Sequence, residues 1–388
     1  MIRRIAAALF IALVPSLHAQ GTLSTQGLGF PPGQLSTRAL TMGGSTGEAD
    51  ALSPLNPAAL ILLLSPIVAV QADPEHRELT LGTERISSSV SRFPLFMGAL
   101  PLGTRWRVGL TVSTLLDRSY ETTVRDTQVV NADSALSTLT ERSLGSISDI
   151  RLGAAFAVNR WLSVGLGAHA LSGSDAIILT RVFDDTIRFQ TDEQRNVIGF
   201  GGHALSVGVL ASVTRVGAVG FSYRRGGSIN AYDSDDVVVG SGNAPHHFGV
   251  SLLYLGLRGS TLAVRAARDD WSELEGMAGT LNIHEGWDIG VGADVTGPRF
   301  GGSAIDLRAG GRWRTLPFSI SGNPVSEQTW SGGFMLPMGR LLGSARSVEL
   351  NFGALRSTRT SAGIPGPTGV IPVSERSWII STGFSVRP

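Results

Sequence analysis

Extended segments with alternating chemistry run through this chain and constrain its fold more than any other feature. In residues 287–296 one face is apolar and the other is polar or glycine: Trp287, Ile289, Val291, Ala293 and Val295 against Asp288, Gly290, Gly292, Asp294 and Thr296. The same period of two recurs in 105–113, 162–169, 305–310 and 348–354. This period indicates β-strands with two unlike faces, and helical periodicity is hard to find.

Strands of this kind fit either a soluble β-sandwich or a transmembrane β-barrel. In the sandwich the apolar face forms the core, whereas in the barrel it meets lipid and the polar face lines the lumen. We expect fourteen strands, at 66–80, 86–100, 105–122, 143–158, 161–175, 195–214, 216–230, 245–255, 260–271, 286–296, 304–315, 329–337, 347–358 and 373–387. An even number of strands of this length favours a closed antiparallel barrel.

The lengths of the predicted links also favour the barrel. Short links fall at 101–104, 159–160, 215, 256–259, 297–303 and 337–346. Longer links alternate with them, at 118–142, 176–194, 231–244, 270–285, 316–328 and 359–372. Short turns at one end and long loops at the other are typical of outer-membrane barrels. The short link at 81–85 breaks this alternation.

Tryptophan placement gives a third indication. The seven tryptophans often stand at strand ends: Trp106, Trp161, Trp271, Trp287, Trp313, Trp330 and Trp378. Aromatic girdles mark the two interfaces of a membrane barrel. We therefore predict an all-β fold, a 14-stranded antiparallel transmembrane β-barrel.

Composition narrows the possible functions. Lys and Arg together number 32, all of them Arg, against 31 acidic residues, and this balance argues against nucleic-acid binding. The chain has no cysteine, so disulfide frameworks and thiolate metal sites are excluded. We expect no metal site and no cofactor. Glycine accounts for 49 of 388 residues, and small lumen-facing residues would leave interior volume and permit bends.

The first residues indicate export. Met1–Arg4 is basic, Ile5–Val14 is apolar, and Ala19 ends a small-residue cleavage site. We predict a signal peptide at 1–19 and a location in the outer membrane. The rest divides into an irregular N-terminal segment at 20–64 and the barrel at 65–388.

The N-terminal segment carries a motif known from one family. Its pieces are Arg38-Ala39-Leu40, Met42-Gly43-Gly44, Ala49-Asp50-Ala51 and Asn56-Pro57-Ala58. In order and spacing they resemble the N-terminus of the FadL-like outer-membrane barrels, the long-chain fatty-acid transporters and their relatives. The resemblance implies that residues 20–64 fold into the lumen as a hatch. It assigns hatch or gating roles to Gly43, Gly44, Asp50, Asn56, Pro57 and Ala58.

Charged residues on the polar faces of the strands form a second candidate set. We expect Arg105, Arg107, Asp288, Asp294, Asp306, Arg308 and Glu349 to point into the lumen. Charges in so small an interior must pair or stay hydrated. They would hold the hatch in place or line a polar pathway.

Two functions remain open. The first is a FadL-like uptake channel for hydrophobic small molecules, which would pass the hatch or leave sideways through a strand kink. The second is a docking partner for a secretion or surface-assembly protein, as in PorV-like relatives. Outer-membrane lipids and lipopolysaccharide would surround either barrel. No catalytic signature stands out in the sequence, so we expect no enzyme.

Overall fold

The computed structural model describes residues 23–25, 27–130, 133–214, 216–278, 282–300, 303–319, 322–338, 347–366 and 369–387. The predicted signal peptide lies outside these residues. Within them, no helix is long and apolar enough to cross a membrane.

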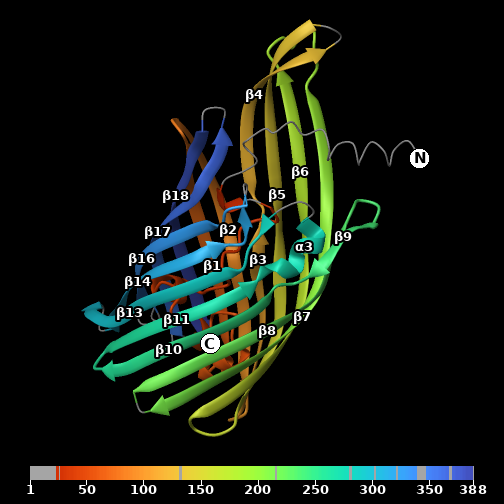
Figure 1. Ribbon diagram of the computed structural model, residues 1–388. Helices are drawn as coiled ribbons and strands as arrows, with labels where there is room; N and C mark the ends of the chain where they lie inside the picture. Colours follow the sequence, from red (N-terminus) through yellow and green to blue (C-terminus); the bar gives the residue numbers. More distant parts are fainter. Residues whose placement is uncertain are drawn as a thin grey trace.

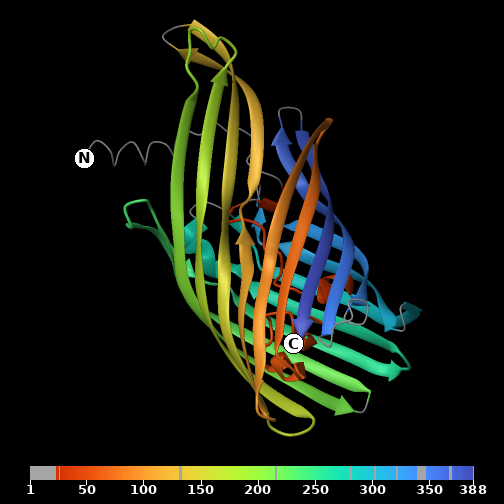
Figure 2. The same ribbon diagram turned by 180° about the vertical axis from the view of Figure 1, so that it is seen from behind.

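Fourteen antiparallel strands close into a barrel (Figures 1 and 2). They are β1 (Ile67–Leu81), β2 (Glu84–Leu102), β3 (Trp106–Asp117), β5 (Asp133–Ala157), β6 (Leu162–Phe183), β7 (Asp192–Thr214), β8 (Gly217–Tyr232), β10 (His246–Leu257), β11 (Ser260–Asp270), β13 (Gly286–Phe300), β14 (Ser303–Leu316), β16 (Val325–Pro337), β17 (Ser347–Gly366) and β18 (Gly369–Arg387). β18 returns to pair with β1 and closes the ring. The predicted fold class is confirmed, and each predicted strand has its counterpart.

Shorter elements lie off the ring. β4 (Tyr120–Val130) pairs with β5, β9 (Val238–Asn243) pairs with β8, and β12 (Asn282–Ile283) pairs with β15 (Phe318–Ser319). The helical turns are η1 (Leu23–Thr25), α2 (Thr37–Thr41), η2 (Gly47–Ala49), η3 (Pro57–Leu62), η4 (Trp271–Leu274) and α3 (Glu275–Ala278).

Several links predicted as long loops are strands instead. The 118–142 region holds β4 and the first part of β5, and these rise with β6 and β7 above the rest of the ring (Figure 1). Polar residues predominate on both faces of this region, so no apolar face marks a strand there. However, β-branched residues such as Thr122, Thr123 and Val124 favour the extended backbone, and Thr122 is buried although Thr123 is exposed.

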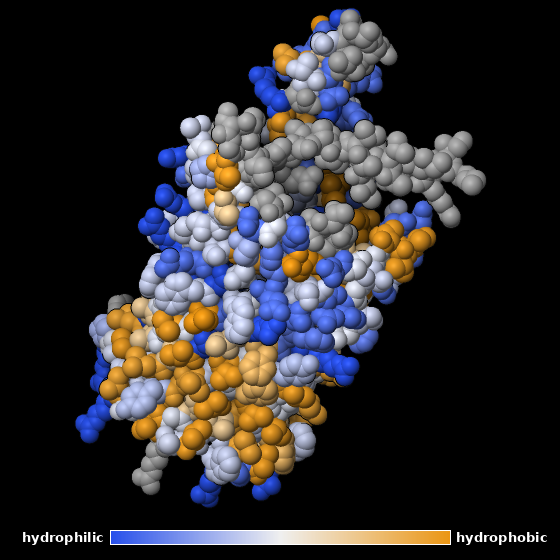
Figure 3. Space-filling model, viewed as in Figure 1, coloured by the Kyte–Doolittle hydropathy of each residue, from blue (hydrophilic) through white to orange (hydrophobic). Residues whose placement is uncertain are grey.

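Burial of side chains is inverted relative to a soluble protein. On β6 the inward Ser163 and His169 are buried, while the outward Leu166 is 66% exposed. Arg77, Arg151, Arg265 and Arg359 are among the largest fully buried side chains. Apolar side chains gather over the lower part of the surface, where β8, β10, β11 and β13 lie (Figure 3). A sandwich would bury those side chains, so this pattern identifies the outer face as the one suited to lipid.

The interior of the barrel is filled by the chain that precedes β1. We call residues 27–64 the interior segment; they are drawn in red and orange-red within the strands in Figure 2. η3 contacts β3, β5, β6 and β7, η2 contacts β8 and β10, and α2 contacts β14, β16, β17 and β18. The segment therefore spans the lumen and touches strands on opposite sides of the ring.

The outward apolar face provides a direct test of lipid contact. Leu166 is the middle residue of an outward apolar run from Leu162 to Ala170. We expect Leu166→Arg to lower the free energy of unfolding from lipid vesicles by about 2–4 kcal/mol, measured by urea titration, because the charge would lie within hydrocarbon. The control Val213→Arg, at a strand end beside a short turn, should cost about 1 kcal/mol or less. Equal costs for the two variants would contradict a lipid-facing band.

Candidate functional site

The interior segment packs against glycines of the wall. A Cβ added at Gly310 of β14 would lie 2.2 Å from the Met42 carbonyl carbon, and one at Gly208 of β7 would lie 1.9 Å from Asn56 Oδ1. Gly165, Gly220, Gly290 and Gly292 make the same kind of close approach. Since any larger residue would collide with the segment, these glycines form a groove for its backbone. The high glycine content thus serves close packing as well as open volume.

Two glycines of the segment itself allow one of its turns. Gly43 and Gly44 have φ angles of +64° and +75°, a region that residues with a Cβ rarely adopt. A Cβ at Gly43 would also lie 2.4 Å from the Gly311 carbonyl oxygen. Both residues predicted for the hatch therefore sit where the segment turns directly against β14.

The Asn-Pro-Ala motif anchors the next part of the segment. Asn56 Oδ1 accepts a hydrogen bond from Ala58 N at 2.9 Å and caps η3, and Pro57 takes the first helical position. The Asn56 amide donates to the carbonyl oxygens of Glu48 at 2.6 Å and Val209 at 3.0 Å. One side chain therefore joins two turns of the segment to strand β7.

Asp50 organises the segment from within. Its carboxylate accepts hydrogen bonds from Ser36 Oγ at 2.5 Å and Ser53 Oγ at 2.7 Å. Ser36 also caps α2 by accepting from Ala39 N. Asp50 thereby holds α2 against the turn that precedes Asn56, and this role is local to the segment.

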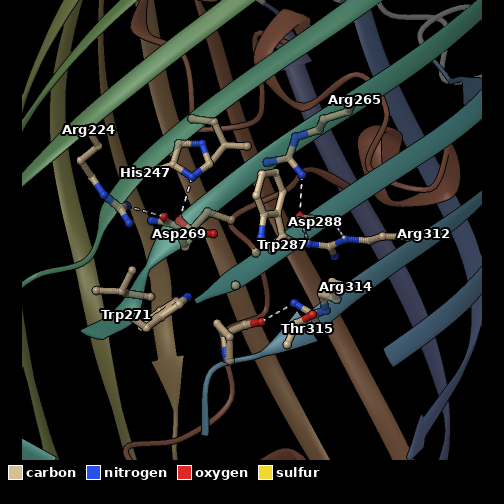
Figure 4. A pocket seen from close by; sticks show the side chains of 16 residues that line it. Arg224, His247, Arg265, Asp269, Trp271, Trp287, Asp288, Arg312, Arg314 and Thr315 are labelled. Carbon is tan, nitrogen blue, oxygen red and sulfur yellow. Dashed lines mark hydrogen bonds and ion pairs between the residues drawn. The ribbon is translucent and has the colours of Figure 1, made fainter. Parts of the chain in front are cut away.

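A cluster of buried charges fastens η2 to the wall, and Figure 4 shows its wall members Arg265, Asp288 and Arg312. Arg265 of β11 donates to Glu48 Oε2 at 2.8 Å and to Asp288 Oδ2 at 2.5 Å, and Arg312 of β14 binds Asp288 at 2.7 and 2.8 Å. Burial raises the pKa of Glu48, but Arg265 and His247 outweigh burial and lower the pKa to about 2. Glu48 is therefore ionised at neutral pH, and we call this group the Glu48 cluster.

A second cluster surrounds an aromatic ring. The guanidinium carbons of Arg77, Arg92, Arg314 and Arg359 lie 5.7, 5.1, 4.8 and 4.7 Å from the centre of the Phe30 ring. Four carboxylates, those of Glu75, Asp117, Glu327 and Glu375, balance these four arginines through buried ion pairs. Such cation–π contacts are strongest when desolvated, so Phe30 is held by charge as well as by packing.

The wall has a seam beside this cluster. The β2–β3 ladder stops at Leu95 and Ser113, although β2 continues alongside β1 and β3 continues alongside β5. Above that point Arg92 of β2 forms an ion pair with Asp117 of β3. Phe30 exchanges two backbone hydrogen bonds of 2.8 Å with Asp117. The interior segment thus takes the place of β2 next to the top of β3.

The predicted lumen charges fall into separate groups. Asp288 belongs to the Glu48 cluster. Arg308 bonds Asp294 at 3.1 Å and lies 3.8 Å from Asp306, while Glu349 pairs with Arg387 near a strand end. They form no single continuous network among the described residues.

The two arginines near Trp106 differ from each other. Arg107 is buried and donates to backbone carbonyls, including that of Leu63 at 2.6 Å. The inward placement of Arg105 is wrong, because β3 begins at Trp106 and leaves Arg105 exposed in the turn at 103–105. The alternation of the strand does not extend into that turn.

An apolar cluster that the sequence analysis did not identify lies toward the upper part of the lumen. Its buried members come from the segment, from β3, β5, β6, β7 and β8, and from the connections between strands: Leu28, Leu115, Leu116, Ile147, Leu171, Phe200, Ile229, Ala231, Ala244, Trp271, Leu274 and Phe318. We call it the upper apolar cluster. A cavity of about 40 Å³ adjoins it at Leu115 and Trp271, enough for a few waters (Figure 4).

No described group of three or more His, Asp or Glu side chains is arranged to hold a metal ion. The charges in the lumen are instead paired with arginine. In the part of the chain that the structure covers, the site is a lumen filled by the interior segment, with the packed upper apolar cluster above it.

Gly208 tests the glycine groove. We expect Gly208→Ala to displace Asn56 and break its two bonds to carbonyl oxygens, because the added methyl overlaps Asn56 Oδ1. Amide hydrogen exchange of residues 54–60, followed by mass spectrometry, should speed up about tenfold or more. The control Gly98→Ala adds a methyl where no atom lies within 4 Å. The groove would be refuted by equal exchange in both variants.

Glu48 tests the ionic anchor. We expect Glu48→Gln to lower the free energy of unfolding by about 3 kcal/mol, because buried Arg265 loses one of its two carboxylate partners. The exposed pair Arg125–Asp184 supplies a control, and Asp184→Asn should change stability by about 1 kcal/mol or less. Urea titration in vesicles measures both. If Glu48→Gln is as stable as the control variant, the Glu48–Arg265 ion pair does not anchor the segment.

Comparisons with known proteins agree with the barrel. No protein-family model matches the chain, and no curated protein matches it by sequence. Among solved structures, the toluene transporter TodX of Pseudomonas putida superposes with a TM-score of 0.58 at 12% identity, covering 93% of this chain and 99% of that one. A FadL homologue of Pseudomonas aeruginosa gives 0.56 at 14% identity, covering 92% and 98%.

A third structure, the toluene transporter TbuX of Ralstonia pickettii, gives a TM-score of 0.52 at 13% identity and covers 93% of this chain and 98% of that one. These likenesses extend over nearly the whole of both chains. The chain therefore has the fold of the FadL-like outer-membrane barrels, as its N-terminal motif implied.

Proposed function

We propose that this protein is an outer-membrane channel for the uptake of hydrophobic small molecules, with no chemical step in transport. The observation that carries the proposal is the upper apolar cluster, enclosed by a lipid-facing barrel and seated above a segment that plugs the lumen. The fold shared with a FadL homologue and two toluene transporters supports it. The docking alternative has no comparable support among the described residues.

The driving force for capture is burial of apolar surface. A ligand entering the upper apolar cluster leaves water for contacts with Leu171, Phe200 and Ile229, worth about 25 cal/mol per Å² of apolar surface. The polar upper strands keep this end of the barrel in water. The ligand is thus drawn from the aqueous side toward the plug.

For the ligand to be released, either the interior segment must move or the strands of the wall must separate. In this proposal the interior segment is the hatch, with Gly43, Gly44, Asp50, Asn56, Pro57 and Ala58 setting its shape. The seam between β2 and β3 offers a sideways exit where the strands are joined by the Arg92–Asp117 pair and Phe30 rather than by a ladder. Outer-membrane lipids surround the barrel, and contact with lipopolysaccharide remains a prediction.

Leu274 of η4 tests the proposal without altering the barrel wall, because it lies in the connection between β11 and β13 and is buried in the upper apolar cluster. We expect Leu274→Asp to weaken binding of toluene or oleate about tenfold or more, because the pocket would hold an uncompensated charge. Titration calorimetry of the purified protein measures the affinity. The control Ile187→Asp changes a side chain that is 97% exposed and should leave binding unchanged.

Mass spectrometry of apolar molecules that co-purify with the native protein completes the test. A bound hydrocarbon or lipid in the native protein, depleted in Leu274→Asp, supports the channel. Repeated absence of any apolar ligand, with neither toluene nor oleate bound in calorimetry, would overturn it.

A further inference from the structure

Three inward side chains on adjacent strands form a hydrogen-bonded row. Asp149 of β5 lies 2.7 Å from His169 Nδ1 of β6, and His169 Nε2 lies 2.8 Å from Ser206 Oγ of β7. All three residues are at most 6% exposed. The order acid, imidazole and hydroxyl, with each link at hydrogen-bond length, is the geometry by which hydrolases activate a serine.

Hydrogen-bond chemistry fixes the direction of the row when the imidazole is neutral. The Asp149 carboxylate only accepts, so His169 Nδ1 carries the proton and donates it to that carboxylate. His169 Nε2 is then left as an acceptor and takes the hydrogen bond from the Ser206 hydroxyl. This is the tautomer that a general base requires.

Unpaired donors lie next to Ser206. Arg151 is 1% exposed, stands directly across from His169 in the strand register, and has no described partner for its Nε and Nη1. Arg224, the register partner of Ser206, likewise has no described partner for its Nε. Unsatisfied buried donors are rare and costly, and here they belong to the register neighbours of His169 and Ser206, the region where negative charge would develop on an attacked carbonyl oxygen.

The lack of a side chain at Gly167 makes room for the Ser206 hydroxyl. An atom at the Cβ position of Gly167 would lie 2.4 Å from Ser206 Oγ, 3.4 Å from His169 Nε2 and 3.3 Å from Arg151 Cδ. The hydroxyl, the base and the stem of the guanidinium therefore converge over one backbone position.

An apolar surface adjoins the row. Ile147 and Leu171 of the upper apolar cluster each lie two residues from Asp149 and His169, on the same inward face. An apolar acyl chain lying on that cluster would bring its carboxyl group toward Ser206. The arrangement thus favours apolar carboxylic esters over polar substrates.

A residue of the interior segment covers the row. The Gln34 amide donates to Asp149 Oδ2 at 2.9 Å, and its oxygen accepts from Arg224 at 2.8 Å. Gln34 has a φ of +50°, which is uncommon for a residue with a Cβ and shows that its contacts hold it in place. Displacing Gln34 would uncover the row.

We propose that Ser206, His169 and Asp149 hydrolyse carboxylic esters with an apolar acyl chain inside the barrel. Ser206 Oγ bonds to the ester carbonyl carbon while its proton passes to His169 Nε2, and the Arg151 donors hold the oxyanion. The carbon–alkoxide bond then breaks, and His169 protonates the departing alcohol. Water, losing a proton to His169, attacks the acyl-serine and releases the carboxylic acid, and Ser206 regains its proton.

A fluorophosphonate probe tests the serine directly, since it forms a covalent phosphorus–oxygen bond with an activated serine and loses fluoride. We expect peptide mass spectrometry to locate the adduct on Ser206 of the native protein in detergent. Gln34→Gly, which suits the local φ, should label about tenfold faster. Ser206→Ala and His169→Gln should abolish this adduct and reduce hydrolysis of p-nitrophenyl octanoate to the background rate.

Ser222 provides the matched control. It is an inward serine on β8, fully buried, with no described hydrogen-bond partner for its Oγ. Ser222→Ala should therefore leave both labelling and hydrolysis unchanged. A folded protein, identified by its heat-modifiable electrophoretic mobility, that stays unlabelled at Ser206 both as the native chain and as Gln34→Gly would overturn the proposal.

Asp149 acts as a positioning residue through His169. We expect Asp149→Asn to lower kcat for the ester about 10²- to 10⁴-fold with KM nearly unchanged, because the imidazole can then adopt the wrong tautomer. A purely structural role would alter both constants or neither. Labelling and hydrolysis do not depend on transport. The hydrolase proposal can therefore fail while the channel proposal holds, and the channel proposal can fail while the hydrolase proposal holds.

Discussion

The structure depends on how charge is neutralised inside a ring of strands whose outer face is apolar. Because lipid excludes polar groups from the outside, the polar faces of the strands turn inward and bring buried arginines into a small space. Burying a charge is costly unless it is paired. Glu48 on the interior segment and Glu75 on the wall supply that compensation. The plug is thus part of the electrostatics of the barrel as well as a steric block.

The strands could be predicted because their information is local. Each strand can be recognised from an alternation of apolar and polar residues over about ten positions. A one-residue shift in register would turn the polar side chains toward lipid. The interior segment was recognisable from its motif, which places Asn56 and Gly43 at turns of the backbone. The alternation does not show at which residue a strand begins or ends. For that reason the alternation places Arg105 on the strand, although it lies in the turn before β3. In the tall β4–β5 extension the buried side chains include polar ones such as Thr122 and Ser137, while Leu136 is exposed, so no apolar face marked it as strand.

Pairings inside the lumen could not be predicted in the same way. Arg265 meets Glu48 across 217 positions of sequence, and no local pattern relates the two. The row formed by Asp149, His169 and Ser206 crosses three strands diagonally, so it depends on the register of two ladders at once. No pattern in the glycine- and proline-rich sequence around Phe30 predicts its contacts with the arginines. Each of these contacts forms only because the barrel closes and brings distant strands together. The alternation of residues within a single strand does not predict them.

Contact of the interior segment with opposite walls has a consequence for the order of assembly. The segment is synthesised before every strand of the ring, yet α2 packs against β16, β17 and β18, the last strands of the chain, while η3 packs against β5, β6 and β7. Because the segment packs closely against glycines of the wall, a barrel that had already closed would have no room to admit it from either end. This geometry favours an assembly in which the sheet wraps around the N-terminal segment and β1 pairs with β18 last.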